Sequence, residues 1–226
     1  MKILIATPAY GGLVYSKYTQ SLVLTCEMLR AYNIDYQLHY INNQIVTRAR
    51  NMCCSVFLDD KNTTHMLFID ADISWNPKDV LKLIQHDKDC VVGIYPNKGY
   101  YYDINNNLTM NPSSVVKKPI TENGNLIELE YAATGFMLIK RNALEKLKPS
   151  VEQFNMPTGS DPNKQIYNFF DCNVVDNSYL TEDYYFSYLL KKTGEKIYAD
   201  KTISLTHIGT HDYGSLIKNN NMSQKM

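Results

Sequence analysis

Residues 65–75 read HMLFIDADISW, and this stretch decides the fold. An apolar run from Met66 to Ile69 leads directly into two acids, Asp70 and Asp72, which are separated by one residue. A short continuous apolar run is typical of a strand that is buried on both faces, as in parallel sheets. Ligands of open α/β sheets bind outside the carboxyl ends of the strands, and alternate residues of an extended chain point to the same side. The stretch therefore predicts a buried strand that carries two carboxylates into a ligand site.

The neighbouring segments predict an α/β protein with a mostly parallel, doubly wound sheet flanked by helices. Apolar runs alternate with segments of helical spacing, and Ser16 and Asn76-Pro77 are helix-start signals. Strands are expected at residues 2–10, 36–41, 66–69 and 90–96, and helices at residues 16–29, 45–60 and 77–86. Alternation of this kind is typical of a parallel sheet with helices on both faces.

The second half of the chain predicts a smaller antiparallel portion. Residues 99–119 are polar, rich in tyrosine and turn residues, and are expected to form a long excursion or hairpin. Strands are expected at 126–131 and 136–140 on either side of a small-residue turn, with a helix after Asn142. A further helix over 182–193, stopped by Gly194, should be followed by strands at 196–200 and 203–209.

The composition is that of an ordinary soluble globular chain. Of 226 residues, 44% are hydrophobic, and 23 basic residues balance 23 acidic ones. Zero net charge disfavours nucleic acid or an anionic membrane as a partner, so a bound phosphate would need a local site. Five cysteines without CxxC spacing predict reduced thiols. We expect a cytoplasmic protein, because the apolar run at the amino terminus is too short for a signal sequence or a membrane span.

The acid pair invites a divalent cation, although a turn cap and a phosphatase nucleophile are also compatible with it. Mg²⁺ and Mn²⁺ prefer carboxylate oxygens and keep their remaining positions for water and phosphates. Aspartates after a buried strand also commonly cap the next turn. Residues 70–74, DADIS, are also close to the Asp-x-Asp-x-Thr motif of haloacid-dehalogenase-type phosphatases, in which Asp70 would be the nucleophile. That motif normally ends the first strand of the core, whereas two strand-helix units precede it here.

Two further classes share the expected fold. A nucleotidyltransferase would need a glycine-rich triphosphate loop after the first strand, and residues 7–17, TPAYGGLVYSK, do not contain one. A non-catalytic module that binds a sugar or a nucleotide is the alternative outside the enzymes.

Six motifs follow one another in a recognisable order. They are ATPAY at 6–10, TRARN at 47–51, DAD at 70–72, ATGFMLI at 133–139, TED at 181–183 and THIG at 206–209. In this order the chain resembles glycosyltransferases of the GT-A fold, in particular family-2-like enzymes and the compact enzymes of large DNA viruses. The resemblance extends over nearly the whole chain.

The resemblance implies a single GT-A domain over residues 1–226. Residues 1–98 would be the nucleotide-binding half and 99–216 the acceptor side, and 217–226 would be a frayed tail. The implied activity is metal-dependent transfer of a sugar from a nucleotide diphosphate sugar, expected to be a UDP-sugar, to a hydroxyl of a glycan or protein. Mn²⁺ or Mg²⁺ is the implied cofactor and inversion the expected outcome, and a virus-encoded enzyme of this kind would act in the host cytoplasm.

The resemblance also assigns roles to residues. Asp183 would be the general base, with Glu182 orienting the acceptor, although acids after the helix-capping residue Thr181 are also favoured by the helix dipole. The metal would be held by Asp72 and, in part, by Asp70 and His207, with His211 as the rival of His207. The donor would contact Thr7, Pro8, Ala9, Tyr10, Arg48, Asn51, Asp70, Ala71 and Gly135, with Arg50 competing with Arg48.

Overall fold

A computed structural model gives the structure of the protein and describes residues 1–117, 122–156 and 161–210. The frayed tail expected at 217–226 and the rival ligand His211 lie outside the described residues. None of the helices in this described part combines the length and apolar character needed to cross a bilayer.

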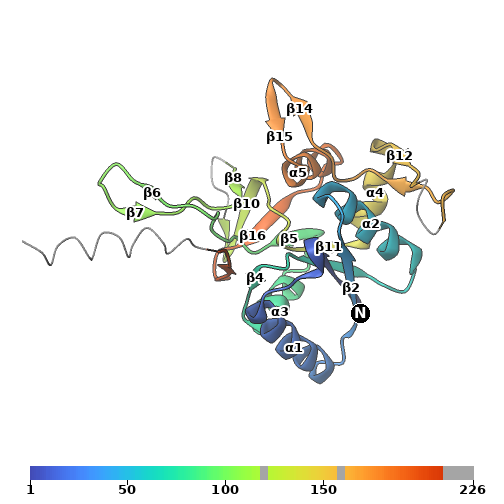
Figure 1. Ribbon diagram of the computed structural model, residues 1–226, viewed down its shortest axis with the longest axis horizontal. Coiled ribbons are helices and arrows are strands. Elements are labelled where there is room, and N and C mark those ends of the chain that lie inside the picture. Colours follow the sequence, from blue (N-terminus) through green and yellow to red (C-terminus); the bar gives the residue numbers. More distant parts are fainter. Residues whose placement is uncertain (118–121, 157–160, 211–226) are drawn as a thin grey trace, which may run out of the picture.

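The described residues form one nine-stranded sheet as the centre of the fold (Figure 1). Its order is β2-β1-β3-β11-β5-β16-β10-β8, and β9 pairs with β10. Strands β2, β1, β3, β5 and β16 run in one direction, and β11 runs against its neighbours β3 and β5. The strands are β1 (Lys2–Ala9), β2 (Asp35–Asn42), β3 (His65–Ile69), β5 (Cys90–Val92), β8 (Val115–Val116), β9 (Glu122–Asn123), β10 (Leu126–Tyr131), β11 (Phe136–Lys140) and β16 (Ile197–Asp200). The predicted mostly parallel α/β architecture is confirmed.

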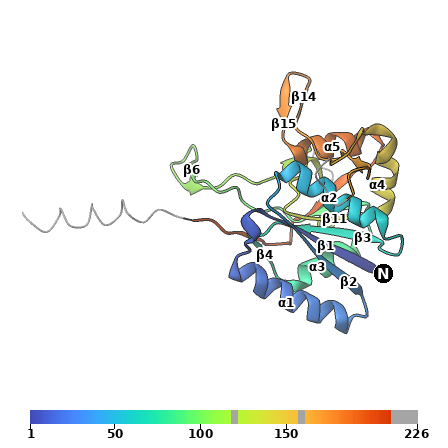
Figure 2. The same ribbon diagram turned by 45° about the vertical axis from the view of Figure 1, so that its right-hand side comes forward.

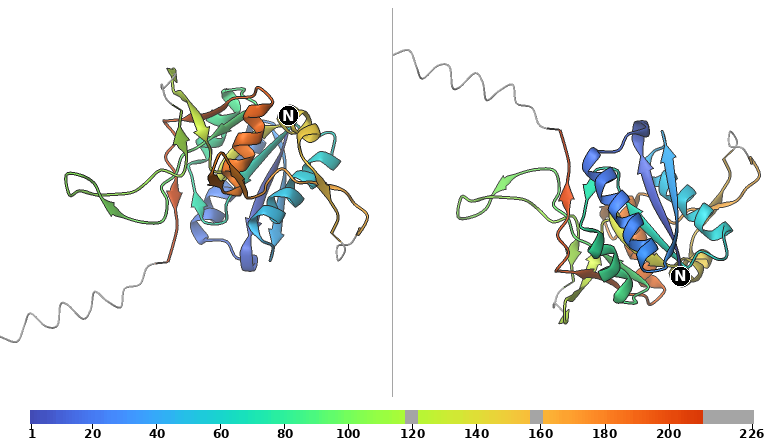
Figure 3. Two further views of the ribbon diagram at one scale, coloured as in Figure 1. Left: turned by 90° about the horizontal axis from the view of Figure 1, so that it is seen from above. Right: turned by 90° about the horizontal axis from the view of Figure 1, so that it is seen from below.

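Helices cover both faces of this sheet. Alternate residues of β3 divide between two cores, with Met66 and Phe68 in one and Leu67 and Ile69 in the other, as a strand buried on both faces requires. The helices α1 (Ser16–Ala31) and α3 (Pro77–Gln85) pack on one face, and α2 (Val46–Asp59), α4 (Arg141–Leu147) and α5 (Glu182–Lys192) on the other (Figure 2). Figure 3 shows α5, in orange, over one face and α1, in blue, over the other.

The N-cap of α3 is the predicted residue, whereas that of α1 is not. Asn76 caps α3 as predicted: its side chain accepts the Lys78 N–H at 3.0 Å, and the Asp79 carboxylate accepts the Asn76 N–H at 3.3 Å. The predicted cap Ser16 is instead the first helical residue of α1, and Tyr15 is the N-cap. The backbone of Tyr15 is extended, and its N–H donates to the Ala71 carbonyl at 3.1 Å, which ties the start of α1 to the segment that carries the acid pair.

The second half contributes short antiparallel pairs, as predicted, and most of them lie outside the central sheet. Two of the expected strands are shorter than the apolar runs suggested: β5 ends at Val92, and the segment 203–209 pairs only over β17 with β4. At Gly93, Ile203 and Leu205 lie 2.8 Å from where a Cβ would stand, so this crossing segment fills the space beside the chain after β5. The short strands are β4 (Ile73–Ser74), β6 (Tyr101–Tyr102), β7 (Leu108–Thr109), β12 (Gln153–Phe154), β13 (Ile166–Tyr167), β14 (Asn173–Val175), β15 (Ser178–Leu180) and β17 (Thr206–His207).

Candidate active site

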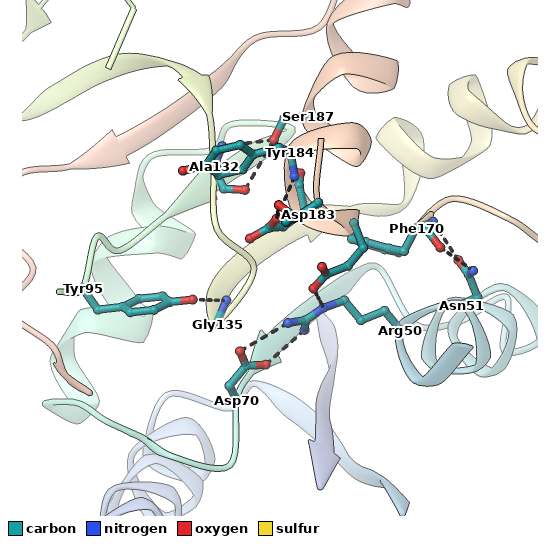
Figure 4. Close-up of polar contacts among 12 residues, drawn as sticks. Arg50, Asn51, Asp70, Tyr95, Ala132, Gly135, Phe170, Asp183, Tyr184 and Ser187 are labelled. Atoms are coloured by element: carbon teal, nitrogen blue, oxygen red, sulfur yellow. Dashed lines mark hydrogen bonds and ion pairs between the residues drawn. The ribbon is translucent and has the colours of Figure 1, made fainter. Parts of the chain in front are cut away.

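A buried arginine joins the acid at the end of β3 to the acid at the start of α5 (Figure 4). Arg50 is 3% exposed, and its two terminal nitrogens donate to the two oxygens of Asp70 at 3.0 and 3.2 Å. Its Nε donates to Glu182 Oε1 at 3.4 Å. Burial would lower the pKa of Arg50, but the charges of Asp70 and Glu182 outweigh it and raise the pKa. This pair of contacts fixes α2 and α5 around the carboxyl end of β3.

The position expected for Arg48 is taken by Arg50. Residues two positions apart in an α-helix point in directions that differ by about 200° around its axis. Arg48 and Arg50 of α2 therefore cannot face the same way. Arg50 faces the sheet, where its guanidinium also lies over the Phe68 ring at 5.5 Å, and Arg48 is exposed. Arg50 is therefore the arginine of α2 that contacts Asp70, and a donor contact of Arg48 stays a prediction.

Asp183 has one engaged carboxylate oxygen and one open one. Its Oδ1 accepts the Thr181 hydroxyl at 2.5 Å and the Tyr184 N–H at 2.9 Å. Among the described residues, no hydrogen bond reaches its Oδ2. Burial, followed by the nearby charge of Glu182, raises the pKa of Asp183. Thr181 is the N-cap residue of α5 as predicted, but its hydroxyl holds this carboxylate rather than a helix N–H.

Asp72 lies beside a histidine from the far end of the chain. The His207 Nε2 is 3.5 Å from Asp72 Oδ2, and the His207 Nδ1–H donates to the Pro96 carbonyl at 2.8 Å. The Ile208 N–H donates to the Asp72 carbonyl at 2.8 Å, which holds the two segments together. Burial would raise the pKa of Asp72, but hydrogen bonds from His207 and Lys98 outweigh it and lower the pKa.

A cleft of about 640 Å³ opens between the end of β1, the start of α2 and the acid pair. Five of the predicted donor residues line it: Pro8, Ala9, Tyr10, Asp70 and Ala71. Tyr10 is 82% exposed and follows β1, where Gly11 and Gly12 take left-handed φ values of 70° and 68° that a side chain would disfavour. Arg50 and Asp72, which the resemblance also brought to the site, line it as well, together with residues that the sequence did not suggest: Leu13, Tyr15, Ile41, Gln44, Ile45 and Val46.

Three other predicted donor residues are engaged inside the protein. The Thr7 hydroxyl is paired with the Tyr18 hydroxyl at 2.6 Å. Asn51 donates to Asn168 and to the Phe170 carbonyl, and accepts the Phe170 N–H, each at 2.9 Å.

Gly135 also packs inside the protein, against Tyr95. Its N–H donates to the Tyr95 hydroxyl at 3.1 Å, and a Cβ there would stand 2.4 Å from that hydroxyl. Gly135 therefore allows the close approach of Tyr95, and a substrate contact of Gly135 stays a prediction.

Comparison with known proteins identifies the family. A family model described as glycosyl transferase family 2 matches residues 24–148, which is more than half of the 226-residue chain. The chain belongs to glycosyl transferase family 2. No curated protein matches the sequence of this glycosyltransferase.

Solved structures with the same fold include a viral protein and a GT-A enzyme. A197 from STIV is 20% identical with a TM-score of 0.52, covering 93% of this glycosyltransferase and 87% of A197. GalNAc-T7, determined with UDP, GalNAc and Mn²⁺, is 13% identical with a TM-score of 0.52. That match covers 94% of this glycosyltransferase but 44% of GalNAc-T7, so the chain spans less than half of that relative. These likenesses show the GT-A fold.

The residues of this glycosyltransferase fit a divalent cation at Asp72 and His207. Because a carbonyl can only accept, the Pro96 contact places a proton on Nδ1, so a neutral His207 ring presents its Nε2 lone pair to a cation beside Asp72, and a protonated ring donates from Nε2 to Asp72 instead. A cation between two such acceptors is stabilising, and a carbonyl partner of this kind typically orients a ligating histidine. The described residues contain no group of three acid, histidine or cysteine side chains placed for a metal. Asp70 is bound to Arg50 through both of its oxygens, and its part in a cation site stays a prediction.

The sequence contained a signal for Arg50 but none for the irregular segments of the site. Cys53, Cys54 and Phe57 are buried three, four and seven residues after Arg50, which is the spacing of one helix face. Lys98 and Tyr95 of this glycosyltransferase follow β5 in a segment without regular structure, where no periodicity gives the direction of a side chain.

Proposed function

We propose that this glycosyltransferase moves a sugar from a nucleotide diphosphate sugar to a hydroxyl of a glycan or protein, with inversion and with Asp183 as general base. The observation that carries the proposal is the carboxylate of Asp183, which is fixed through one oxygen and open at the other. The pKa of Asp183 is raised, which suits an acceptor of the hydroxyl proton, and Asp183 directly follows Glu182, which Arg50 joins to the cleft-lining Asp70.

The cleft would hold the donor. The exposed ring of Tyr10 would stack on the base. Asp70 keeps 26% of its side chain exposed while Arg50 fixes its orientation. A carboxylate has about four lone-pair sites, so Asp70 can accept from ribose hydroxyls while it remains bound to Arg50. Glu182, held by Arg50 Nε, would position the acceptor beside Asp183.

Asp72 and His207 would hold Mn²⁺ or Mg²⁺. The cation, when bound, would neutralise the charge that develops on the departing diphosphate. The Pro96 carbonyl keeps the His207 ring in the orientation that this site needs. We propose UDP as the nucleotide because the GT-A neighbour GalNAc-T7 was determined with UDP and Mn²⁺.

The phosphatase alternative is disfavoured by the contacts of Asp70. The guanidinium of Arg50 donates to both Asp70 oxygens and withdraws charge from them, which weakens this carboxylate as a nucleophile, and the family match favours glycosyl transfer. Trapping of a phosphoaspartate at Asp70 would restore that alternative.

Nucleotide binding should depend on both a divalent cation and Asp72. UDP with Mn²⁺ should raise the Tm of the wild-type protein above the shift given by UDP alone, because a ligand that binds only the folded state stabilises it. Asp72→Ala should lose the cation-dependent part of the shift, whereas Asp35→Ala, which changes an exposed aspartate of β2, should keep it. The measurement is a thermal-shift panel of UDP, GDP, ADP and CMP, each with and without Mn²⁺. A cation-dependent shift that survives in Asp72→Ala would contradict the assignment.

Turnover should fall in acid at a higher pH than an ordinary aspartate would impose. The base must be deprotonated to accept a proton, and the raised pKa of Asp183 means that the carboxylate form is lost earlier as the pH is lowered. Glu182→Gln removes a neighbouring negative charge and should move this acidic limb to lower pH. The check is kcat against pH for both proteins. An acidic limb that stays in place in Glu182→Gln would show that another group controls it.

A further inference from the structure

The side chain of Lys98 occupies the cation position of Asp72. Its Nζ donates to Asp72 Oδ2 at 2.5 Å, and this is the oxygen that faces His207 Nε2. The side chain of Lys98 is 42% exposed and that of Asp72 is 26% exposed. An ammonium from within the chain therefore sits where the cation of the proposed function would bind.

The side chain of Lys98 packs against Gly209 and borders an open hollow. Its aliphatic stem crosses Gly209, where a Cβ would stand 3.2 Å from the Lys98 Cδ. A hollow of about 600 Å³ adjoins it, lined by residues that include Lys98, Tyr100, Met110 and His207. A long, flexible lysine can leave Asp72 for this open space without any change in the core.

We propose that Lys98 is a tethered counter-ion for Asp72, and that a divalent cation binds in exchange for it. The inference rests on the proposed function, because it concerns the same cation site. An ammonium and a divalent cation repel each other and require the same oxygen, so one must leave when the other arrives. Cation binding in the absence of nucleotide is accordingly weakened by the Lys98–Asp72 pair, and Lys98 keeps Asp72 neutralised between rounds of donor binding.

Titration with Mn²⁺ alone tests the exchange, with free Mn²⁺ followed by electron paramagnetic resonance. Lys98→Ala should tighten Mn²⁺ binding by about fivefold, the scale of a partly exposed ion pair. Lys61→Ala, which changes an exposed lysine preceding β3, should stay within about twofold of wild type, because distant surface charges are screened by salt. Asp72→Ala should lose the site. Tm values without ligand establish that each variant is folded.

The outcomes separate this inference from the proposed function. If Asp72→Ala loses Mn²⁺ binding but Lys98→Ala binds it no more tightly than wild type, the exchange is wrong and the cation site stands. If no Mn²⁺ binds to any variant, Lys98→Ala included, the exchange is also wrong. If Asp72→Ala binds Mn²⁺ as wild type does, the cation site itself is misplaced. If Lys61→Ala tightens Mn²⁺ binding as much as Lys98→Ala does, the effect comes from the change in net charge, and the proposed exchange is wrong.

Discussion

Asp183→Asn should lower kcat by about 10²–10⁴-fold while the protein folds and binds nucleotide as before, because this is the usual contribution of a general base. An asparagine carbonyl can still accept from the Thr181 hydroxyl and the Tyr184 N–H, so the local structure at the start of α5 should be kept. The amide cannot accept the proton of the acceptor hydroxyl. The measurements are UDP release with an acceptor found by screening and the UDP–Mn²⁺ thermal shift.

Asp176→Asn provides the matched control for this variant. Asp176 is an exposed aspartate in the β14–β15 turn, where its φ of 48° suits asparagine as well. Its turnover should equal that of wild type. If Asp183→Asn keeps turnover within about tenfold of wild type, a range below the usual contribution of a general base, the base is another group.

Arg50→Met should lower the free energy of unfolding by about 3 kcal/mol, the lower end for breaking a buried ion pair, because its partners are only partly exposed. Removal of the guanidinium leaves Asp70 and Glu182 facing each other across the site without a counter-charge, with side chains 26% and 13% exposed. The measurement is urea unfolding. Arg50→Met combined with Asp70→Asn should recover part of the loss, because it removes one of the unpaired charges.

Arg48→Met is the control on the same helix. Arg48 is exposed, so its replacement should change the free energy of unfolding by less than about 0.5 kcal/mol. The variant also tests the donor contact that the sequence suggested for Arg48. A loss of nucleotide binding in Arg48→Met, with binding retained in Arg50→Met, would return the donor contact to Arg48.

The regular half of the protein could be predicted because its signals are local. The apolar run before Asp70 becomes β3, and the Asn76 capping signal begins α3, since each depends on residues close in sequence. The antiparallel insertion of β11 was not predictable in this way. Its apolar sequence is compatible with either direction, and the direction is set by its pairing with β3 and β5.

The sequence predicted which segments form the candidate site, but it predicted few of the contacts between their side chains. Asp72 and His207 meet, as the motif order suggested, although they lie far apart in the sequence. The hydrogen bonds of Asn51 with Phe170 depend on long-range packing that no motif encodes. Lys98 is likewise placed beside Asp72 by the path of an irregular segment.

The position of β11 between β3 and β5 means that residues 1–98 and the segment after them share one hydrogen-bonded sheet. A fragment that stopped at residue 98 would lack β11 and β16, so β3 would become an open edge and β5 would lose both of its partner strands. The remaining fragment would carry Asp183 without the acid pair. Splitting the gene at this point would therefore yield two aggregation-prone fragments. Donor-binding and acceptor-binding parts built as separate domains could be exchanged between proteins, but the shared sheet prevents this here.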